Sequence, residues 1–259
     1  MSKIRFTEPN REILARRDSI INDLTRLVDP AGLITSTDEC RAYETDALTA
    51  YRKMPLAVVL PKTTEEVSAV LKYCHDTGVK VVPRGAGTSL AGGAIPSEDA
   101  VVLGLSKMNR VLAVNYDDRF IRVEAGVTNL SVTAVVAENG FFYAPDPSSQ
   151  LACTIGGNIA NNSGGAHCLK YGVTTNNLLG VRMVLIDGSI IDLGGDYLDS
   201  AGLDLLGLVV GSEGQLGIVT EATLRILKSA EGARPVLFGF PSCEGAGKAV
   251  ADVIAAGII

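Results

Sequence analysis

The spacing of apolar positions changes along the chain. Residues 8–28 carry apolar side chains at near-helical intervals, which predicts an amphipathic helix. An irregular polar stretch follows to about residue 55. Beyond it, short apolar runs alternate with helical patterns, and this alternation is typical of proteins that combine sheets with helices. We therefore expect an α+β fold.

The clearest unit is a strand, a helix and a second strand. Ala57–Leu60 and Val79–Val82 have the apolar runs of strands, and Val67–His75 has helical spacing. Thr63-Thr64-Glu65-Glu66 has the sequence of a capping box, and Gly78 is typical of a helix end. Because the connections are short, we expect a crossover unit whose two strands run parallel.

Further elements follow the same patterns, except in residues 145–180, where many Gly, Asn and Ser residues and little periodicity predict no regular element. Asp187-Gly188, between apolar runs, is a strong hairpin signal. The predicted strands are Val101–Leu105, Val111–Asn115, Phe120–Glu124, Val181–Ile186, Ile190–Leu193, Ile218–Leu227 and Pro235–Phe240. The predicted helices are Leu130–Glu138, Leu203–Val210 and Glu244–Ala256.

These elements predict several domains. The last helical run stops at Gly257 and is followed by two isoleucines, where a further strand would begin, so we expect a fragment of a longer chain. The predicted parts are an N-terminal helix and lead-in (1–54), two α/β subdomains (55–145 and 146–230) and the start of a truncated C-terminal domain (231–259).

Composition narrows the class of protein. The net charge is −6 and no Lys/Arg-rich run occurs, which argues against nucleic acid as a partner. No apolar run approaches the roughly 20 residues of a membrane span, and the charged N-terminus lacks the apolar core of a secretory signal. We therefore expect a cytoplasmic protein. The five cysteines form no C-x-x-C pair, so we predict neither a zinc nor an iron–sulfur site and expect reduced thiols.

The stretch VVPRGAGTSLAGGAIP, residues 81–96, is the first candidate site. Its glycines cost conformational entropy, which a fold accepts where φ is positive or something approaches the main chain closely. A Rossmann loop needs Gly or Ala where Leu90 stands, and a helix after it, and no Gly-Lys-Ser/Thr of a Walker loop occurs. Two interpretations remain: an anion-binding nest of backbone N–H groups, or a plain turn. Arg84 either neutralises a bound anion or pins the loop.

Two later stretches, residues 154–165 and 211–220, are also rich in glycine and short polar side chains. Each of the three stretches adjoins a predicted strand or helix. Together they suggest one large ligand in a cleft between two lobes, such as a dinucleotide whose phosphates are held by backbone groups. The pattern alone does not name that ligand.

Five motifs in order carry a family resemblance: PRGAGTSLAGGAIP, APDPSS, TIGGNIANNSGG, KYG and GSEGQLGIVT. They resemble the FAD-binding domains of the vanillyl-alcohol-oxidase/PCMH family, most of all those of glycolate oxidase D subunits and FAD-linked D-lactate and D-2-hydroxyglutarate dehydrogenases. The resemblance extends over residues 33–227. It implies a PCMH-type FAD-binding domain of two α/β subdomains that enclose an extended FAD, followed by a cap domain.

The resemblance also implies which residues bind FAD. Those expected to bind the pyrophosphate through main-chain N–H groups are Arg84, Gly85, Ala86, Gly87, Thr88 and Ser89. Those expected along the flavin and its ribityl chain are Pro145, Ser149 and Thr154. Those expected around the phosphate and isoalloxazine are Gly156, Gly157, Asn158, Asn162 and Ser163. Those expected at the adenine or the ring edge are Gly214, Gly217, Ile218 and Val219.

Some members of the family attach FAD covalently through a His near the glycine loop. No His or Cys occurs in this loop, so we expect non-covalent FAD. His167 either approaches the flavin or is a structural imidazole, and Tyr171 either stacks near FAD or fills the core.

The function implied is that of a flavin-dependent 2-hydroxy-acid dehydrogenase or oxidase, of the glycolate or D-lactate type, in which the substrate's α-carbon gives a hydride to N5 of FAD. The family's substrate-binding and metal-binding residues lie in the C-terminal half, so we assign no catalytic and no metal residue here. The alternatives are the FAD domain of a sugar-lactone or alcohol oxidase, and a flavin-free module that retains the fold. The resemblance further implies a second flavin-type subunit and an iron–sulfur subunit as partners, and through them a peripheral place at the inner membrane.

Overall fold

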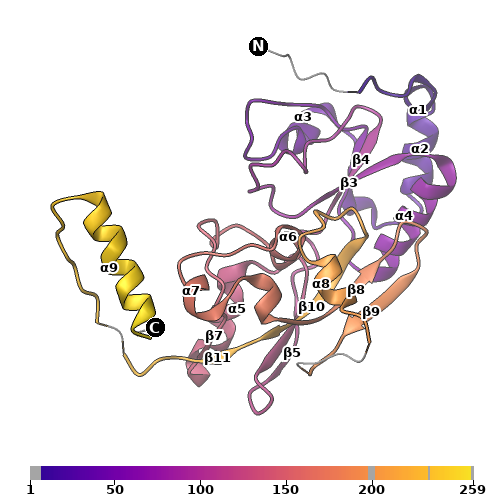
Figure 1. The fold of residues 1–259 in the computed structure, drawn as a ribbon. Coiled ribbons are helices and arrows are strands. Elements are labelled where there is room, and N and C mark those ends of the chain that lie inside the picture. Colours follow the sequence, from indigo (N-terminus) through magenta and orange to yellow (C-terminus); the bar gives the residue numbers. More distant parts are fainter. Residues whose placement is uncertain (1–6, 198–201, 233, 258–259) are drawn as a thin grey trace. The chain divides into compact units, whose positions relative to one another are not determined.

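The computed structural model describes residues 7–197, 202–232 and 234–257. The chain divides into two compact units, Met1–Leu227 and Lys228–Ile259 (Figure 1). The first unit contains the two large sheets, and the second contains the last helix.

The first sheet has four strands in the order β1-β2-β4-β3. Its strands are β1 (Leu33–Ile34), β2 (Ala57–Val59), β3 (Lys80–Arg84) and β4 (Ala100–Gly104). Both β2 and β3 run parallel to β4, which lies between them. The predicted parallel direction is therefore confirmed, but the two strands of the predicted crossover unit are not neighbours.

The N-terminal region differs from its prediction because the single expected helix is broken. The structure has α1 (Arg11–Ala15) and α2 (Arg17–Leu24), with Arg16 between them at φ −94° and ψ 8°. The N–H of Arg16 bonds to the carbonyl of Ile13, three residues back, which is a tighter turn than the α-helix allows. The short segments that follow are η1 (Pro30–Gly32), α3 (Thr37–Cys40) and η2 (Arg41–Tyr43).

The helix α4 (Thr64–Thr77) extends beyond the predicted Val67–His75 at both ends, and the predicted capping box and Gly78 delimit it. The side chain of Thr63 accepts a hydrogen bond from the N–H of Glu66, and Gly78 ends the helix at φ 73°. The carboxylate of Glu66 bonds to the N–H of Lys62 and not to that of Thr63, so the reciprocal half of the capping box is shifted by one residue. The buried face of α4 packs in one core with the first sheet.

The second sheet has five antiparallel strands in the order β5-β6-β10-β8-β9. Its strands are β5 (Val111–Asn115), β6 (Phe120–Glu124), β8 (Leu178–Val184), β9 (Ile190–Gly194) and β10 (Ile218–Arg225). The sheet thus includes the β5–β6 hairpin, which the predicted subdomain boundary placed with the first subdomain. The division at residues 145 and 146 stays a prediction.

Helices and short segments complete the first unit around a second hydrophobic core. They are α5 (Asn129–Val136), η3 (Ala137–Asn139), β7 (Phe141–Phe142), α6 (Ile155–Asn161), α7 (Cys168–Tyr171), η4 (Thr174–Asn177) and α8 (Leu205–Val209). The two-residue strand β11 (Leu227–Lys228) contains the last residue of the first unit and the first residue of the second. The helix α6 was not predicted, because glycine and asparagine are poor helix formers. Thr154 caps it, and Ile155 and Ile159 anchor it with fully buried side chains.

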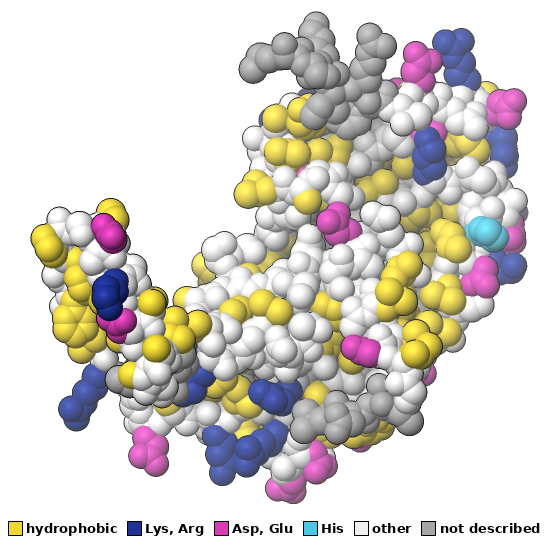
Figure 2. Space-filling view, viewed as in Figure 1, with side chains coloured by type: hydrophobic (Ala, Val, Ile, Leu, Met, Phe, Trp, Pro, Cys, Tyr) yellow, Lys and Arg dark blue, Asp and Glu magenta, His cyan; other side chains and the backbone are white. Residues whose placement is uncertain are grey.

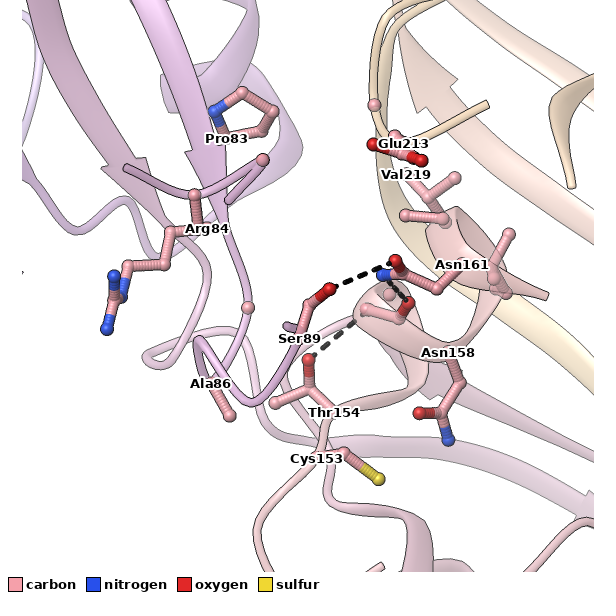
Figure 3. Close-up of a pocket in the computed structure, with 18 of the residues that line it drawn as sticks. Pro83, Arg84, Ala86, Ser89, Cys153, Thr154, Asn158, Asn161, Glu213 and Val219 are labelled. Carbon is pink, nitrogen blue, oxygen red and sulfur yellow. Dashed lines mark hydrogen bonds between the residues drawn. The ribbon is translucent and has the colours of Figure 1, made fainter. Parts of the chain in front are cut away.

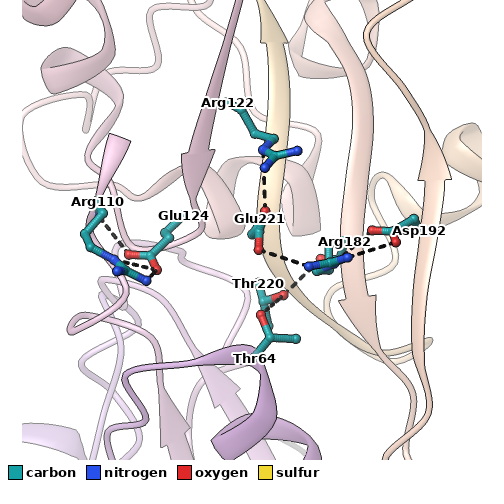
Figure 4. A network of polar contacts seen from close by, with 8 residues as sticks. All are labelled: Thr64, Arg110, Arg122, Glu124, Arg182, Asp192, Thr220 and Glu221. Carbon is teal, nitrogen blue, oxygen red and sulfur yellow. Dashed lines mark hydrogen bonds and ion pairs between the residues drawn. The ribbon is translucent and has the colours of Figure 1, made fainter. Parts of the chain in front are cut away.

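Two hydrogen bonds join α4 to the second sheet. The hydroxyl of Thr64 donates to that of Thr220 over 3.0 Å (Figure 4). The hydroxyl of Ser68 donates to the carbonyl of Gly188 over 2.6 Å. Thr64 and Thr220 are both buried, and a buried hydroxyl left without a partner is costly. These contacts fix the first sheet's helix against the second sheet and so help to set the space between the lobes.

The second unit consists of an extended segment and α9 (Cys243–Ala255). The strand predicted at residues 235–240 is wrong, because no described residue pairs with this segment as a strand. Its side chains Val236, Leu237 and Phe238 are exposed, and hydrophobic side chains are visible on this part of the surface in Figure 2. That this unit begins a further domain stays a prediction.

Candidate functional site

A cavity of about 240 Å³ lies within the first unit, between the loop after β3 and the segments around α6 and β10. All three glycine-rich stretches contribute to its lining. Figure 3 shows the loop residues on one side, with Asn161, Glu213 and Val219 facing them across the space. Stretches more than 40 residues apart in sequence are therefore brought to one site, as the sequence predicted.

All but two of the residues predicted to bind the cofactor line this cavity. Those that line it are Arg84, Gly85, Ala86, Gly87, Thr88, Ser89, Ser149, Thr154, Gly156, Gly157, Asn158, Ser163, Gly214, Gly217, Ile218 and Val219. The two that do not are Pro145 and Asn162. Lining a cavity is not contact with a ligand, so the individual contacts stay predictions.

The loop after β3 presents a run of unpaired backbone donors. Among the described residues, no acceptor takes a hydrogen bond from the N–H groups of Gly85 to Ser89. The loop is held from its other side, where the carbonyl of Ser89 accepts from the N–H of Ala47 and that of Arg84 accepts from Leu105. Consecutive N–H groups fixed in this way suit a phosphate group. The arrangement favours the nest over the plain turn.

The side chain of Arg84 pins the loop. Its guanidinium donates to the carbonyl of Thr45 over 2.7 Å and lies 5.5 Å from the centre of the Tyr43 ring. Burial lowers the pKa of Arg84, while Tyr43 and Asp46 act in the opposite direction. In Figure 3 the side chain points away from Ser89 and Thr154. Of the two roles considered for this side chain, the contacts thus support the structural one.

Small residues let the segments approach closely. A Cβ atom on Gly85 would lie 2.5 Å from Oγ1 of Thr154, and one on Gly214 would lie 2.8 Å from Cγ of Pro83. Both distances are below ordinary contact. The first clash would reach the capping group of α6, because Thr154 Oγ1 accepts a hydrogen bond from the N–H of Gly157. The glycines are therefore required by the convergence of the two lobes.

The side chains of the two asparagines predicted to bind the cofactor, Asn158 and Asn162, form hydrogen bonds with other residues of the chain. The amide of Asn158 donates to Oδ1 of Asn129 over 2.8 Å, and Asn129 donates to the carbonyl of Pro145 over 2.9 Å. Asn129 and Asn158 are both buried. Asn162 ends α6 at φ 49°, and its Oδ1 accepts from the N–H of Thr175. These side chains thus hold the walls of the cavity in place.

Sequence reasoning missed several lining residues, among them Cys153, Asn161 and Glu213. Asn161 links the lobes, because its Oδ1 accepts from the hydroxyl of Ser89 at 3.5 Å while its amide donates to the carbonyl of Gly157. A signal was available for Asn161: once α6 is recognised from Ile155 and Ile159, Asn161 lies one turn after Gly157, on the same helix face.

His167 and Tyr171 do not line the cavity. Nδ1 of His167 lies 3.2 Å from the carbonyl oxygen of Ala144 and 3.5 Å from Oδ2 of Asp146. The rings of His167 and Tyr171 both meet Phe142 edge to face. These contacts favour the structural interpretation of both residues. Within the described ranges, no group of three or more His, Cys, Asp and Glu side chains could hold a metal ion.

Among the residues that the structure describes, no helix combines the length and hydrophobicity required to cross a bilayer.

Comparisons with known proteins agree with the predicted family and fold. The profile of the FAD binding domain matches residues 55–194. Glycolate oxidase subunit GlcD of Escherichia coli K12 is 49% identical over 243 residues, which cover 94% of this chain and 49% of that protein. GlcD of Bacillus subtilis is 44% identical, with 84% and 46% covered. D-lactate dehydrogenase of Archaeoglobus fulgidus is 38% identical, with 91% and 52% covered.

A solved structure of alkyldihydroxyacetonephosphate synthase has the same fold, with a TM-score of 0.81 at 22% identity, covering 99% of this chain and 48% of that one. The chain spans about half the length of the curated relatives it matches. The predicted fold, FAD as cofactor and family are confirmed: this chain belongs to the family of FAD-binding domains found in flavoenzymes of the glycolate oxidase GlcD and D-lactate dehydrogenase type.

Proposed function

We propose that this chain is the FAD-binding part of a 2-hydroxy-acid dehydrogenase or oxidase of the glycolate or D-lactate type. The observation that carries the proposal is the run of unpaired N–H groups from Gly85 to Ser89 at a cavity that all three glycine-rich stretches line. FAD, when bound, supplies the capacity to accept a hydride from a substrate carbon. The chain's own residues bind the cofactor, orient it and limit its contact with water.

The residues present fit a dinucleotide. The N–H groups of Gly85 to Ser89 would take its phosphates without the need for a charged side chain. The glycines near Thr154 leave the space that any larger residue would fill. The adjoining backbone offers further donors, because the N–H groups of Gly214 and Gly217 bond to no acceptor among the described residues. We propose that attachment is non-covalent.

The substrate and the partners are part of the same proposal. The relatives at 49% and 38% identity are named for glycolate oxidase and D-lactate dehydrogenase, so a small 2-hydroxy acid is the substrate class we propose. We propose no catalytic residue in this chain, and expect it to bind FAD without turning over substrate. Assembly with a second flavin-type subunit and an iron–sulfur subunit, peripheral to a membrane, belongs to the same proposal.

The test is an FAD titration of the purified chain, followed by the quenching of FAD fluorescence. The variant is Ala86→Glu, which places a carboxylate on an exposed loop residue beside the proposed phosphate site. Repulsion between the carboxylate and the phosphates should weaken FAD binding by about 10- to 100-fold. Ala86→Gln, with the same shape and no charge, and Leu90→Glu, exposed and outside the cavity lining, should bind FAD within about threefold of the unmodified chain.

Each result decides one part of the proposal. If the unmodified chain shows no flavin absorption after purification with FAD and no quenching in the titration, it is a flavin-free module and the proposal fails. If Ala86→Glu and Ala86→Gln bind FAD equally, the loop is not the phosphate site. Dye reduction by the FAD-loaded chain with glycolate or D-lactate should stay at background, and rapid turnover would contradict the absence of catalytic residues.

A further inference from the structure

Glu213 has a backbone conformation that is unfavourable for glutamate. Its φ is +54°, and among the described residues only Arg119 and Asn162 are other non-glycine residues with positive φ. A left-handed backbone costs a side-chain-bearing residue stability relative to glycine. Asn162 offsets that cost through its hydrogen bond to Thr175, whereas the side chain of Glu213 makes no hydrogen bond or ion pair with any described residue. The side chain of Glu213 therefore stabilises the fold through no hydrogen bond or ion pair with the described residues.

Hydrogen bonds fix the backbone of the turn around Glu213, and its exposed side chain lies at the cavity. The N–H of Glu213 bonds to the carbonyl of Ala160 over 2.8 Å, and that of Gln215 bonds to Ser212 over 3.0 Å. Glu213 lines the cavity, and its Oε2 lies 3.5 Å from the position that a Cβ atom of Gly93 would take. Figure 3 shows Glu213 across the space from Pro83 and Arg84.

The cavity thus has two chemically opposite ends. The N–H groups of Gly85 to Ser89 are donors and favour an anion, whereas the carboxylate of Glu213 accepts hydrogen bonds and repels an anion. A dinucleotide carries both complementary features: a pyrophosphate, and hydroxyl and amino groups that donate hydrogen bonds. A strained, unpartnered residue at a binding cavity is typical of a residue retained for its ligand.

We propose that Glu213 orients the bound dinucleotide: its carboxylate accepts a hydrogen bond from a hydroxyl or amino group of the ligand and excludes phosphate from that end of the cavity. This inference rests on the proposed function, because it requires a ligand whose phosphates occupy the loop of Gly85 to Ser89. It adds a specificity-determining residue that acts through charge, in a site otherwise formed by backbone and small side chains.

The test measures the binding of two probes, FAD and inorganic pyrophosphate, to the unmodified chain and to Glu213→Gln. Loss of the charged acceptor should weaken FAD binding about tenfold. Loss of the repulsion should strengthen pyrophosphate binding, by about threefold. Glu138→Gln removes an exposed charge outside the cavity and should change neither affinity. Titrations with ADP and FMN identify the donor: weaker ADP binding places it on the adenosine, and weaker FMN binding on the ribityl chain.

The opposite signs for the two probes separate this role from a structural one, which would shift both affinities in the same direction. Changes of equal sign, or changes below twofold for both probes, overturn the inference even if the unmodified chain binds FAD. If the unmodified chain fails to bind FAD, the proposed function fails first, and the two failures are thus distinguishable.

A second variant tests the link between strain and binding. Glu213→Gly relieves the left-handed backbone, so the melting temperature of the FAD-free chain should rise by about 2 °C while FAD binding weakens as in Glu213→Gln. A lower melting temperature would show that the side chain supports the fold, and would contradict the inference.

Discussion

The second sheet and the cavity differ in whether their polar groups have partners within the chain. Across β6, β10, β8 and β9 the charged side chains pair in one row: Arg122 with Glu221, Glu221 with Arg182, and Arg182 with Asp192, at 3.6, 3.6 and 3.0 Å (Figure 4). In the cavity, the backbone donors from Gly85 to Ser89 meet no acceptor among the described residues. Groups paired within the chain serve the fold, and unpaired groups that converge on one space serve a ligand.

The largest effect is expected where the cavity depends on the absence of a side chain. In Gly85→Ala, the new Cβ atom would lie 2.5 Å from Oγ1 of Thr154 and 3.6 Å from the Cα atom of Gly157. The two walls must then separate, and the N–H groups of the loop shift relative to α6. We expect FAD affinity to fall about 100-fold, equivalent to about 2.7 kcal/mol, in a fluorescence titration.

The matched control for this change is Gly232→Ala, where a Cβ atom meets nothing within 4 Å and no cavity is lined. It should leave FAD affinity unchanged. The circular dichroism spectrum of Gly85→Ala shows whether the fold is retained, and only the folded fraction counts in the titration. Wild-type affinity in folded Gly85→Ala would show that the close approach of the lobes is unnecessary for binding.

Local patterns were sufficient for much of the fold. Thr63 and Gly78 delimit α4, and Asp187-Gly188 forms the predicted turn, with φ +86° at the glycine. These signals act between residues close in sequence, so the surrounding structure does not alter them. The order of the first sheet could not be obtained in this way, because β4 enters between β2 and β3 through long-range pairing.

In the site, too, some features could be predicted from local sequence and others depend on long-range packing. Glycine spacing and the family motifs identified the three stretches, because backbone approach requires small residues wherever they lie. The helix α6 was missed because its stability comes from the burial of Ile155 and Ile159, and tertiary packing overrides the low helix propensity of GGN. Glu213 was missed because its candidate role in binding follows from its positive φ angle and from the loop that it faces. Neither property can be predicted from one sequence.

An intermediate effect is expected at Asp99, a buried carboxylate that accepts three hydrogen bonds. Asp99 is only 1% exposed and accepts hydrogen bonds from Lys80 Nζ at 2.8 Å, Ser97 Oγ at 2.6 Å and the N–H of Asn10 at 2.9 Å. Burial alone would raise the pKa of Asp99, but these hydrogen bonds outweigh it and lower the pKa from 3.8 to about 2. Asp99→Asn should reduce the free energy of unfolding by about 1–2 kcal/mol at pH 7, measured by urea denaturation.

The sign of the pH dependence follows from the lowered pKa. The folded state binds a proton at Asp99 less readily than the unfolded state, so the stabilisation is complete above pH 4 and declines as the pH falls toward 2. The difference between the unmodified chain and Asp99→Asn should therefore narrow below pH 4. Asp117→Asn, in the exposed turn between β5 and β6, is the control. A difference that stays constant from pH 7 to 3 would show that the ionised carboxylate is not what stabilises the chain.

The smallest effect is expected in the charged row itself, at Asp192. Arg182 donates to both of its carboxylate oxygens, at 3.0 and 3.2 Å, but the two side chains are 42% and 64% exposed. Water and salt screen such a pair, and Arg182 keeps Glu221 as a second partner. Asp192→Asn should lower the free energy of unfolding by about 0.5 kcal/mol in 50 mM salt and by less in 500 mM salt, with FAD affinity unchanged. A loss of FAD affinity would mean that the paired row and the cavity are coupled, and the contrast between a region that serves the fold and one that serves the ligand would then be wrong.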